Sequence, residues 1–316
     1  MASTNKKKIL IRFLKGCAVA IIIYLIVSVL ATKLVYDTVF QRYDASPEEI
    51  SYAAGYAGYD TRETYSYSCG ENTLSGYLYR TSAASEKLVV IVPGFHAETE
   101  HYEGIIQGFT DSGFDVFAFD ATGHGESEGE SSVGFPQIIS DLNATLDFID
   151  KNKDFAYRDI FLFGHSRGGY GACCVVNEHP GISAVISVNG VDTAMDGIMA
   201  YSTDYIGNIA YGNYHFLWLY QYALFGSAVA DRSAVAEISS SDVPVLVIQA
   251  ANDEQLSEGG FSLYSHKDEV SSDKASFVLY NSSEKDGHTS ILYDENGIAN
   301  MEIIEQATEF FNSNVR

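Results

Sequence analysis

The sharpest chemical feature of the sequence is a serine set between glycines, in the run Gly164-His165-Ser166-Arg167-Gly168. An apolar run at 160–163 precedes it, and a helical pattern covers residues 167–178. A serine at a sharp turn from a strand into a helix is exposed at the start of that helix, and flanking glycines permit close backbone approach there. We therefore predict that Ser166 is a nucleophile.

A nucleophilic serine needs partners elsewhere in the chain. Its hydroxyl is a weak nucleophile at neutral pH, so a base must take its proton and an acid must fix the tautomer of that base. Of the eight histidines, only His288 follows the last predicted strand, in Asp286-Gly287-His288-Thr289-Ser290. The alternative reading of His288 is an exposed loop histidine.

The elements around these residues predict a mostly parallel sheet. Continuous apolar runs at 88–92, 116–119, 160–163 and 243–249 are typical of strands buried on both faces, with weaker candidates at 184–188 and 276–280. Helical patterns lie between or after them, at 101–112, 136–151, 167–178, 255–264 and 298–312. Residues 64–68 and 74–79 predict a hairpin before the first buried strand. Strands that alternate with such helices indicate an α/β fold whose sheet is covered on both faces.

Residues 190–236 interrupt this alternation with a long segment rich in aromatic side chains. An insertion of this length in a compact domain favours a cap over the site rather than a simple loop. Aromatic rings in the cap suggest an apolar acyl or aryl pocket. The alternative is that they only pack the cap onto the core.

Together these motifs resemble the α/β-hydrolase superfamily, in the branch of serine aminopeptidases, monoacylglycerol lipases and lysophospholipases. The resemblance covers about residues 64–315. It implies His288 as the catalytic base and Asp253, in Ala250-Ala251-Asn252-Asp253, as the acid that orients it, with Asp192 as the alternative acid. The order Ser166, Asp253, His288 is the order of this superfamily.

The same resemblance implies an oxyanion hole. Val92-Pro93-Gly94-Phe95-His96 occupies the place of the loop after the third strand, so the donors would be the N–H groups of Phe95 and Arg167. Most relatives have His-Gly where this chain has Pro93-Gly94. The run from Asp120 to Ser127 resembles the Asp-x-Arg-Gly-His-Gly-x-Ser loop of the family, with Thr122 in place of the arginine. His124 in that loop is either a site residue or a loop tether.

The charge distribution excludes one class of function. The chain has 42 acidic and 19 basic residues, and residues 1–33 hold six bases without an acid. The remainder is therefore strongly acidic and repels phosphate backbones, so we expect no nucleic-acid partner.

The N-terminus predicts a membrane anchor. Five bases precede an uncharged run of 17 residues, Gly16 to Thr32, which reaches the lower limit for a membrane-spanning helix. We expect a basic cytoplasmic flank at 1–15, a transmembrane signal anchor at 16–36, a linker at 37–60 and the hydrolase domain at 61–316. By the positive-inside rule, that domain is extracytoplasmic on a single-pass cell-membrane protein. The alternative is a cleaved signal peptide and a secreted protein.

The sequence thus predicts a membrane-anchored serine hydrolase that cleaves carboxylic esters of acyl or aryl groups. The alternatives are an aminopeptidase of the same fold, which acts on short peptides, and a catalytically silent, anchored binding module. The predicted mechanism uses no metal or organic cofactor, and no zinc-type spacing of cysteine and histidine occurs.

Overall fold

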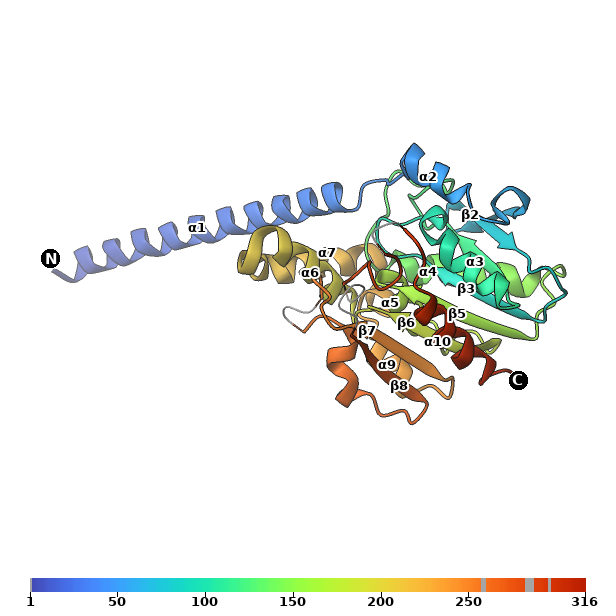
Figure 1. The fold of residues 1–316 in the computed structure, drawn as a ribbon. Helices are drawn as coiled ribbons and strands as arrows, with labels where there is room; N and C mark the ends of the chain where they lie inside the picture. Colours follow the sequence, from blue (N-terminus) through green and yellow to red (C-terminus); the bar gives the residue numbers. More distant parts are fainter. Residues whose placement is uncertain (1, 257–259, 282–286, 295–296) are drawn as a thin grey trace.

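The computed structural model describes residues 2–256, 260–281, 287–294 and 297–316 (Figure 1). One eight-stranded sheet with the order β1-β2-β4-β3-β5-β6-β7-β8 organises this part of the chain. The pairs from β4 to β8 are parallel, whereas β1 and β2 form an antiparallel hairpin added beside β4. The strands are β1 (Glu63–Cys69), β2 (Asn72–Tyr79), β3 (Lys87–Val92), β4 (Asp115–Phe119), β5 (Asp159–His165), β6 (Ile182–Val188), β7 (Val245–Ala250) and β8 (Ala275–Tyr280). The predicted parallel sheet and hairpin are confirmed.

Helices cover both faces of the sheet, which explains the continuous apolar strands. In β3, Leu88 and Val90 join a core with α4 (Gln137–Lys151), α5 (Arg167–Cys174) and α9 (Ala234–Ser239). Val89 and Ile91 point to the other face, where they join a core with α3 (Glu103–Asp111) and α10 (Met301–Asn312). Because successive side chains of a strand point to opposite faces, a strand between two helical layers must be apolar throughout.

One predicted helix is wrong. Residues 255–264 form no continuous helix in the described part of the chain; they begin as a turn, and the short 3₁₀ helix η4 (Leu263–Glu269) follows. The N–H groups of Gln255 and Leu256 donate to the side chain of Asp253, which holds this turn in place. Gly260, with φ of 71°, then takes the left-handed conformation that favours glycine. The other helices lie where the sequence predicts them, with ends that differ by a few residues.

The segment between β6 and β7 forms a helical layer beside the carboxyl ends of the strands (Figure 1). It contains α6 (Ala194–Ile206), η3 (Gly207–Asn213), α7 (Tyr214–Phe225) and α8 (Ser227–Ala230), followed by α9. Thr193 caps α6 by accepting a hydrogen bond from Asp196 N–H, which fixes where the helix begins. We refer to α6, η3, α7 and α8 as the cap.

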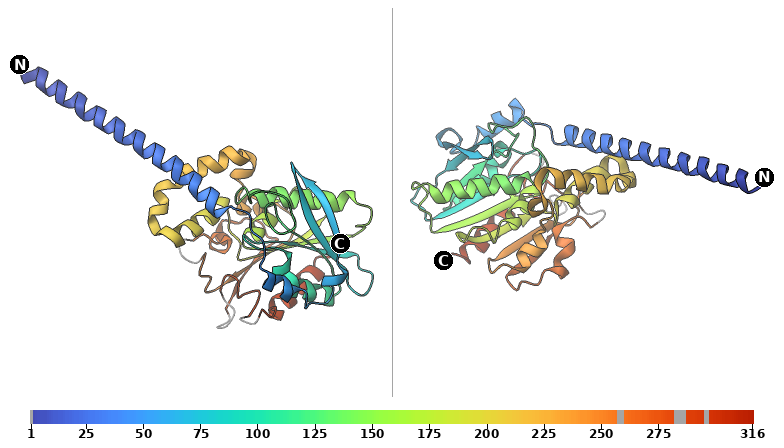
Figure 2. Two further views of the ribbon diagram at one scale, coloured as in Figure 1. Left: turned by 90° about the horizontal axis from the view of Figure 1, so that it is seen from above. Right: turned by 180° about the vertical axis from the view of Figure 1, so that it is seen from behind.

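The N-terminal helix α1 (Ala2–Val39) is a long rod that extends away from the sheet, with its second half beside the cap (Figure 2). Four side chains spaced by four residues are almost fully buried, namely Ser28, Thr32 and Tyr36 in this half and Phe40 directly after the helix. Residues four apart lie on one face of a helix, so these side chains form a single docking stripe. The connection to the domain contains α2 (Pro47–Ala53) and the 3₁₀ helix η1 (Tyr59–Thr61).

The rest of α1 presents apolar side chains to the surroundings. In the described part of the chain, it is the one helix that is long and apolar enough to cross a membrane, over Lys6–Val39. A cleavable signal sequence meets the same criterion of length and composition.

Candidate active site

Ser166 stands at a sharp turn between β5 and α5. Its backbone has φ of 53° and ψ of −120°, a left-handed conformation that a residue with a side chain rarely adopts. The backbone on both sides of Ser166 is packed too closely for a side chain. A Cβ on Gly168 would lie 2.0 Å from the carbonyl oxygen of Val92, and a Cβ on Gly164 would lie 2.3 Å from the carbonyl oxygen of Gly168. The glycines therefore permit the conformation that exposes the Ser166 hydroxyl at the start of α5.

The structure brings the three predicted triad side chains together in one chain of hydrogen bonds. The distance from Ser166 Oγ to His288 Nε2 is 2.9 Å, and that from His288 Nδ1 to Asp253 Oδ2 is 2.8 Å. The exposed fractions are 6% for Ser166, 3% for His288 and 0% for Asp253. In this geometry the imidazole can accept the serine proton while the carboxylate holds its other nitrogen protonated.

Asp253 is held as an anion by its surroundings. Burial by itself raises the pKa of its carboxyl group, but hydrogen bonds from His288 and from the N–H groups of Leu256 and Gln255 keep the pKa below its ordinary value. Gln249 Nε2 also donates to Oδ2, at 3.0 Å. The carboxylate is thus ionised near neutral pH and accepts hydrogen bonds on both of its oxygens.

The backbone of His288 is fixed by three side chains that the sequence analysis did not assign. His165 Nε2 and Asn189 Nδ2 both donate to the carbonyl oxygen of His288, each at 2.9 Å. The carboxylate of Glu254 accepts the His288 N–H at 2.9 Å. Burial lowers the pKa of His165 to about 3, so its ring is neutral and acts as a fixed donor. His165 is part of the serine motif, but its role depends on a contact 123 positions away.

The two predicted oxyanion donors lie beside Ser166. Arg167 is the first residue of α5, and Phe95 lines the same cavity as Ser166. The loop that carries Phe95 is tied down because Gly94 N–H donates to the hydroxyl of Tyr102 at 2.9 Å. Within the described residues, no protein acceptor is paired with the N–H of Phe95 or Arg167. Both groups are therefore free to bind an anionic oxygen.

The side chain of Arg167 adds a buried positive charge behind this loop. It is 1% exposed, one of its terminal nitrogens donates to the Gly94 carbonyl at 3.4 Å, and its guanidinium lies 5.4 Å from the centre of the Phe95 ring. Burial lowers its pKa to about 10, so it remains a cation at neutral pH. The sequence analysis predicted a role only for its backbone.

A cavity of about 270 Å³ leads to Ser166 and His288. Phe95 and His96 line it from the oxyanion loop, and Tyr201 lines it from α6 of the cap. The described residues that line it include no aspartate or glutamate. The described lining contains no lysine or arginine either, and the cap borders the cavity on one side.

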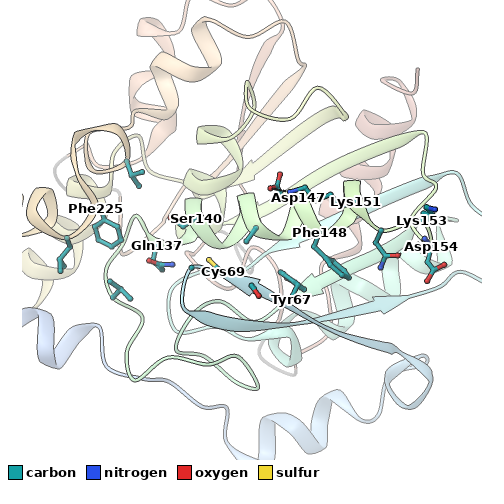
Figure 3. Close-up of a pocket in the computed structure, with 17 residues that line it drawn as sticks. Tyr67, Cys69, Gln137, Ser140, Asp147, Phe148, Lys151, Lys153, Asp154 and Phe225 are labelled. Carbon is teal, nitrogen blue, oxygen red and sulfur yellow. Dashed lines mark hydrogen bonds and ion pairs between the residues drawn. The ribbon is translucent and has the colours of Figure 1, made fainter.

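A larger cavity lies elsewhere in the described part of the chain. Figure 3 shows a cavity of about 1170 Å³ between β1 and α4, with Tyr67, Gln137 and Phe148 along its walls and Phe225 of the cap at one end. Its lining contains none of the predicted site residues. The volume of a cavity therefore does not identify the candidate active site, whereas the hydrogen bond between Ser166 and His288 does.

Other residues considered from the sequence lie outside the serine site. Asp192 accepts hydrogen bonds from the hydroxyl of Ser233 and the N–H of Val235, each at 2.8 Å, and has no contact with His288 among the described residues. His124 is fully buried, and its Nδ1 lies 3.0 Å from the carbonyl oxygen of Thr122, which matches a loop tether. In the described part of the chain, no group of three or more histidine, cysteine or acidic residues is arranged to hold a metal ion.

Part of the chain is similar in sequence to known hydrolases. Residues 83–195 match the family described as serine aminopeptidase, S33. Human monoglyceride lipase is 30% identical over 105 residues, which cover 33% of this chain and 34% of that protein. The mouse monoglyceride lipase is 32% identical over 104 residues. The match thus spans about a third of the length of these relatives.

Solved structures extend the likeness to most of the chain. The esterase Pf2001 of Pyrococcus furiosus superposes with a TM-score of 0.62 at 17% identity, over 88% of this chain and 98% of that one. Est1E of Butyrivibrio proteoclasticus, solved with ferulic acid, gives 0.59 at 21% identity, over 79% and 99%. An acylaminoacyl peptidase of Pyrococcus horikoshii gives 0.58 at 16% identity, over 80% and 41%. These comparisons show that the chain has the α/β-hydrolase fold and that about a third of it is similar in sequence to the serine aminopeptidases and monoglyceride lipases.

Proposed function

We propose that the protein is a membrane-anchored serine hydrolase that cleaves carboxylic esters. The observation that carries this proposal is the hydrogen-bonded chain from Ser166 through His288 to Asp253, next to a cavity whose described lining has no acidic, lysine or arginine side chain. Ester hydrolysis is the function that this geometry supports best.

In the proposed mechanism, Ser166 Oγ attacks the ester carbonyl carbon while His288 Nε2 takes its proton. The N–H groups of Phe95 and Arg167 bind the oxyanion of the tetrahedral intermediate. Collapse of this intermediate releases the alcohol, which takes the proton from His288, and leaves the acyl group on Ser166. Water then repeats the sequence with the same base and releases the carboxylic acid.

The residues around the cavity favour an ester over the amide of an aminopeptidase substrate. An enzyme that binds a free amino terminus needs a carboxylate near the serine, and Asp192, Asp196 and Asp204 lie in or next to the cap. Asp196 is hydrogen-bonded to Thr193 at the start of α6 and Asp192 to Ser233, and none of the three lines the cavity. The peptidase remains the second candidate because the matched family is described as a serine aminopeptidase.

Membrane anchoring is supported by two features of α1. Five bases precede its apolar part, the pattern that keeps the N-terminus cytoplasmic and exports the domain. Its buried stripe from Ser28 to Phe40 packs against the cap and the domain, so cleavage within this segment would remove side chains that the fold buries. Protease added outside intact cells that express the full chain should digest the domain. A protected domain would contradict the extracytoplasmic placement.

A comparison of esters with amides tests the substrate class. Wild type and Ser166→Ala, both as the full chain in detergent micelles, are assayed with p-nitrophenyl butanoate and with leucine p-nitroanilide. We expect wild type to hydrolyse the ester well above the amide, and Ser166→Ala to lose this hydrolysis. Amide hydrolysis at a higher kcat/KM than that of the ester would favour the peptidase, and inactivity of folded wild type towards both would favour a silent binding module.

A further inference from the structure

The segment that joins α1 to the domain is bonded to two loops, one of which carries a proposed oxyanion donor. This segment, residues 39–45, is called the strap below, and it falls within the stretch that the sequence predicts as a linker (Figure 1). The N–H of Tyr43 donates to the carbonyl oxygen of Gly123 at 3.0 Å, and the N–H of Gly125 donates to the carbonyl oxygen of Tyr43 at 3.2 Å. The strap is therefore paired through its backbone with the loop 120–132, which follows β4.

Arg42 fastens the strap to the same loop through its side chain. One terminal nitrogen of its guanidinium donates to the carbonyl oxygens of Ser127 at 2.9 Å and Gly129 at 3.2 Å, and the other donates to the carbonyl oxygen of Gly125. The guanidinium also forms an ion pair with Asp44 at 2.9 Å. Arg42 does not line the cavity that leads to the triad. It therefore fixes the strap without touching the site.

The strap also contacts the oxyanion loop, residues 93–97. His96 Nε2 donates to the carbonyl oxygen of Val39 at 3.1 Å. The ring of His96 stacks on Tyr43, with 5.3 Å between ring centres and 14° between planes, and on Phe95, with 4.0 Å and 24°. These contacts join the strap to the residue that follows the proposed oxyanion donor.

His96 has a backbone conformation that needs support from its surroundings. Its φ is 52°, in the left-handed region that residues with a side chain rarely adopt. Such a conformation persists only where neighbouring groups hold it. The hydrogen bond to Val39 and the stack on Tyr43 are contacts of this kind, and both come from the strap.

The N–H of Phe95 is thus held from two sides. On one side, Gly94 N–H donates to the hydroxyl of Tyr102, and the Gly94 carbonyl oxygen accepts from the guanidinium of Arg167. On the other side, His96 is held by the strap. A displaced strap would let His96 relax and would turn the peptide groups next to it. Because an oxyanion donor acts only at hydrogen-bond distance from the developing charge, a small displacement of Phe95 weakens it.

We propose that the strap is a positioning element of the active site, which holds His96 in its left-handed conformation and so directs the N–H of Phe95 towards the developing oxyanion. This inference rests on the proposed function and gives a role in catalysis to residues that lie outside the predicted hydrolase domain. Arg42 and Tyr43 act through the two loops and do not touch the substrate. The oxyanion forms only when Ser166 attacks, so a weakened donor lowers kcat and leaves KM nearly unchanged.

The test uses Arg42→Ala in the full chain in detergent micelles. Folded enzyme is counted by complete reaction of its serine with a fluorophosphonate, and kcat and KM are measured with p-nitrophenyl butanoate. The Ki of pentyl trifluoromethyl ketone is measured in parallel, because this ketone adds to a catalytic serine and forms a stable tetrahedral oxyanion. We expect kcat to fall at least about tenfold, KM to stay within about twofold, and Ki to rise by the factor by which kcat/KM falls. Loss of folded enzyme alone would leave Ki unchanged.

A second variant and a matched control locate the effect. Tyr43→Ala removes the ring on which His96 stacks but keeps the backbone hydrogen bonds of the strap, and it should give the same pattern. Arg316→Ala is the control, because Arg316 also donates to backbone carbonyl oxygens, those of Pro180 at 2.7 Å and of Ile182 at the start of β6. This end of β6 is opposite the carboxyl ends of the strands, where the triad lies. In Arg316→Ala, kcat and Ki should therefore stay within about twofold of wild type.

The outcomes separate this inference from the function on which it rests. If folded Arg42→Ala and Tyr43→Ala keep the kcat and Ki of wild type, the strap does not position the oxyanion donor, while the esterase stands. The inference is equally wrong if kcat falls while Ki stays the same, or if Arg316→Ala loses as much as Arg42→Ala. If folded wild type hydrolyses no ester, the proposed function fails, and the role of the strap fails with it.

Discussion

Replacing Asp253 by asparagine changes the charge and hydrogen bonding of the triad without changing its shape. One carboxylate oxygen of Asp253 accepts the N–H groups of Gln255 and Leu256, at 2.9 and 3.0 Å. The other oxygen accepts from His288 Nδ1 at 2.8 Å and from Gln249 Nε2 at 3.0 Å. The backbone donors will hold the oxygen of the new amide, which turns its NH₂ group towards His288. A donor in that position forces the His288 proton onto Nε2.

A histidine with its proton on Nε2 cannot take the proton of Ser166. In serine hydrolases with this triad, the corresponding change lowers kcat by about 10⁴, or roughly 5.5 kcal/mol of transition-state stabilisation. We expect a loss of this order in steady-state hydrolysis of p-nitrophenyl butanoate at pH 7.5 by Asp253→Asn. The fold should survive, because the N–H groups of Gln255 and Leu256 can donate to the amide oxygen of asparagine as they do to the carboxylate.

The control is Asp192→Asn, the other acid that the sequence offered. Asp192 is bonded to Ser233 and Val235 and not to the triad, so its variant should keep kcat within about threefold of wild type. A folded Asp253→Asn enzyme with kcat within tenfold of wild type would refute the assignment of the acid. So would a larger loss in Asp192→Asn than in Asp253→Asn.

Three other predictions concern the sharp turn at Ser166, the buried carboxyl group of Glu98 and the cap. Gly168→Ala places a Cβ 2.0 Å from a backbone carbonyl oxygen of β3, so it should abolish esterase activity and lower the melting temperature by several degrees. Gly181→Ala, whose Cβ would lie 3.8 Å from its nearest neighbour, should do neither. Equal effects of the two variants would argue against the tight turn at Ser166. Burial, and then the charge of Asp120, raise the pKa of Glu98 from 4.5 to about 8, so the folded state keeps a proton that the unfolded chain releases. The contribution of Glu98 to the free energy of unfolding should therefore fall as the pH rises from 4.5 to 8, and Glu98→Gln should flatten this pH dependence in urea titrations. An unchanged slope in Glu98→Gln would contradict the raised pKa of Glu98. Trp218, the single tryptophan, lies in α7, so lipids brominated on their acyl chains should quench its fluorescence in vesicles, and unaltered emission would show that the cap lies outside the bilayer.

The order of strands and helices was predictable because each buried strand is apolar throughout and each helix repeats its apolar positions. Ser166, Asp253 and His288 were predicted as the triad because each lies in a local motif that resembles those of the α/β-hydrolases, and the structure places their side chains in one chain of hydrogen bonds. The helix predicted at 255–264 was wrong: Gly260 takes a left-handed conformation, and a 3₁₀ helix begins only at Leu263.

Residues that position the triad were beyond local sequence reasoning. Asn189 and Glu254 act through contacts with His288, which is 99 and 34 positions away, and Gln249 contacts Asp253 from the strand that precedes it. The stripe of α1 did leave a trace, since polar and aromatic side chains recur every four residues from Tyr24 to Phe40. That spacing is hidden in a run in which almost every residue is apolar.

The most direct test of the central claim is covalent labelling of the full chain with a fluorophosphonate probe. We expect wild type to be labelled at Ser166, Ser166→Ala to remain unlabelled, and His288→Ala to react far more slowly because its serine has no base. Mass spectrometry of the labelled peptide identifies the modified residue. Absence of labelling in folded wild type, or a label at another residue that persists in Ser166→Ala, would contradict the claim that Ser166 is the nucleophile.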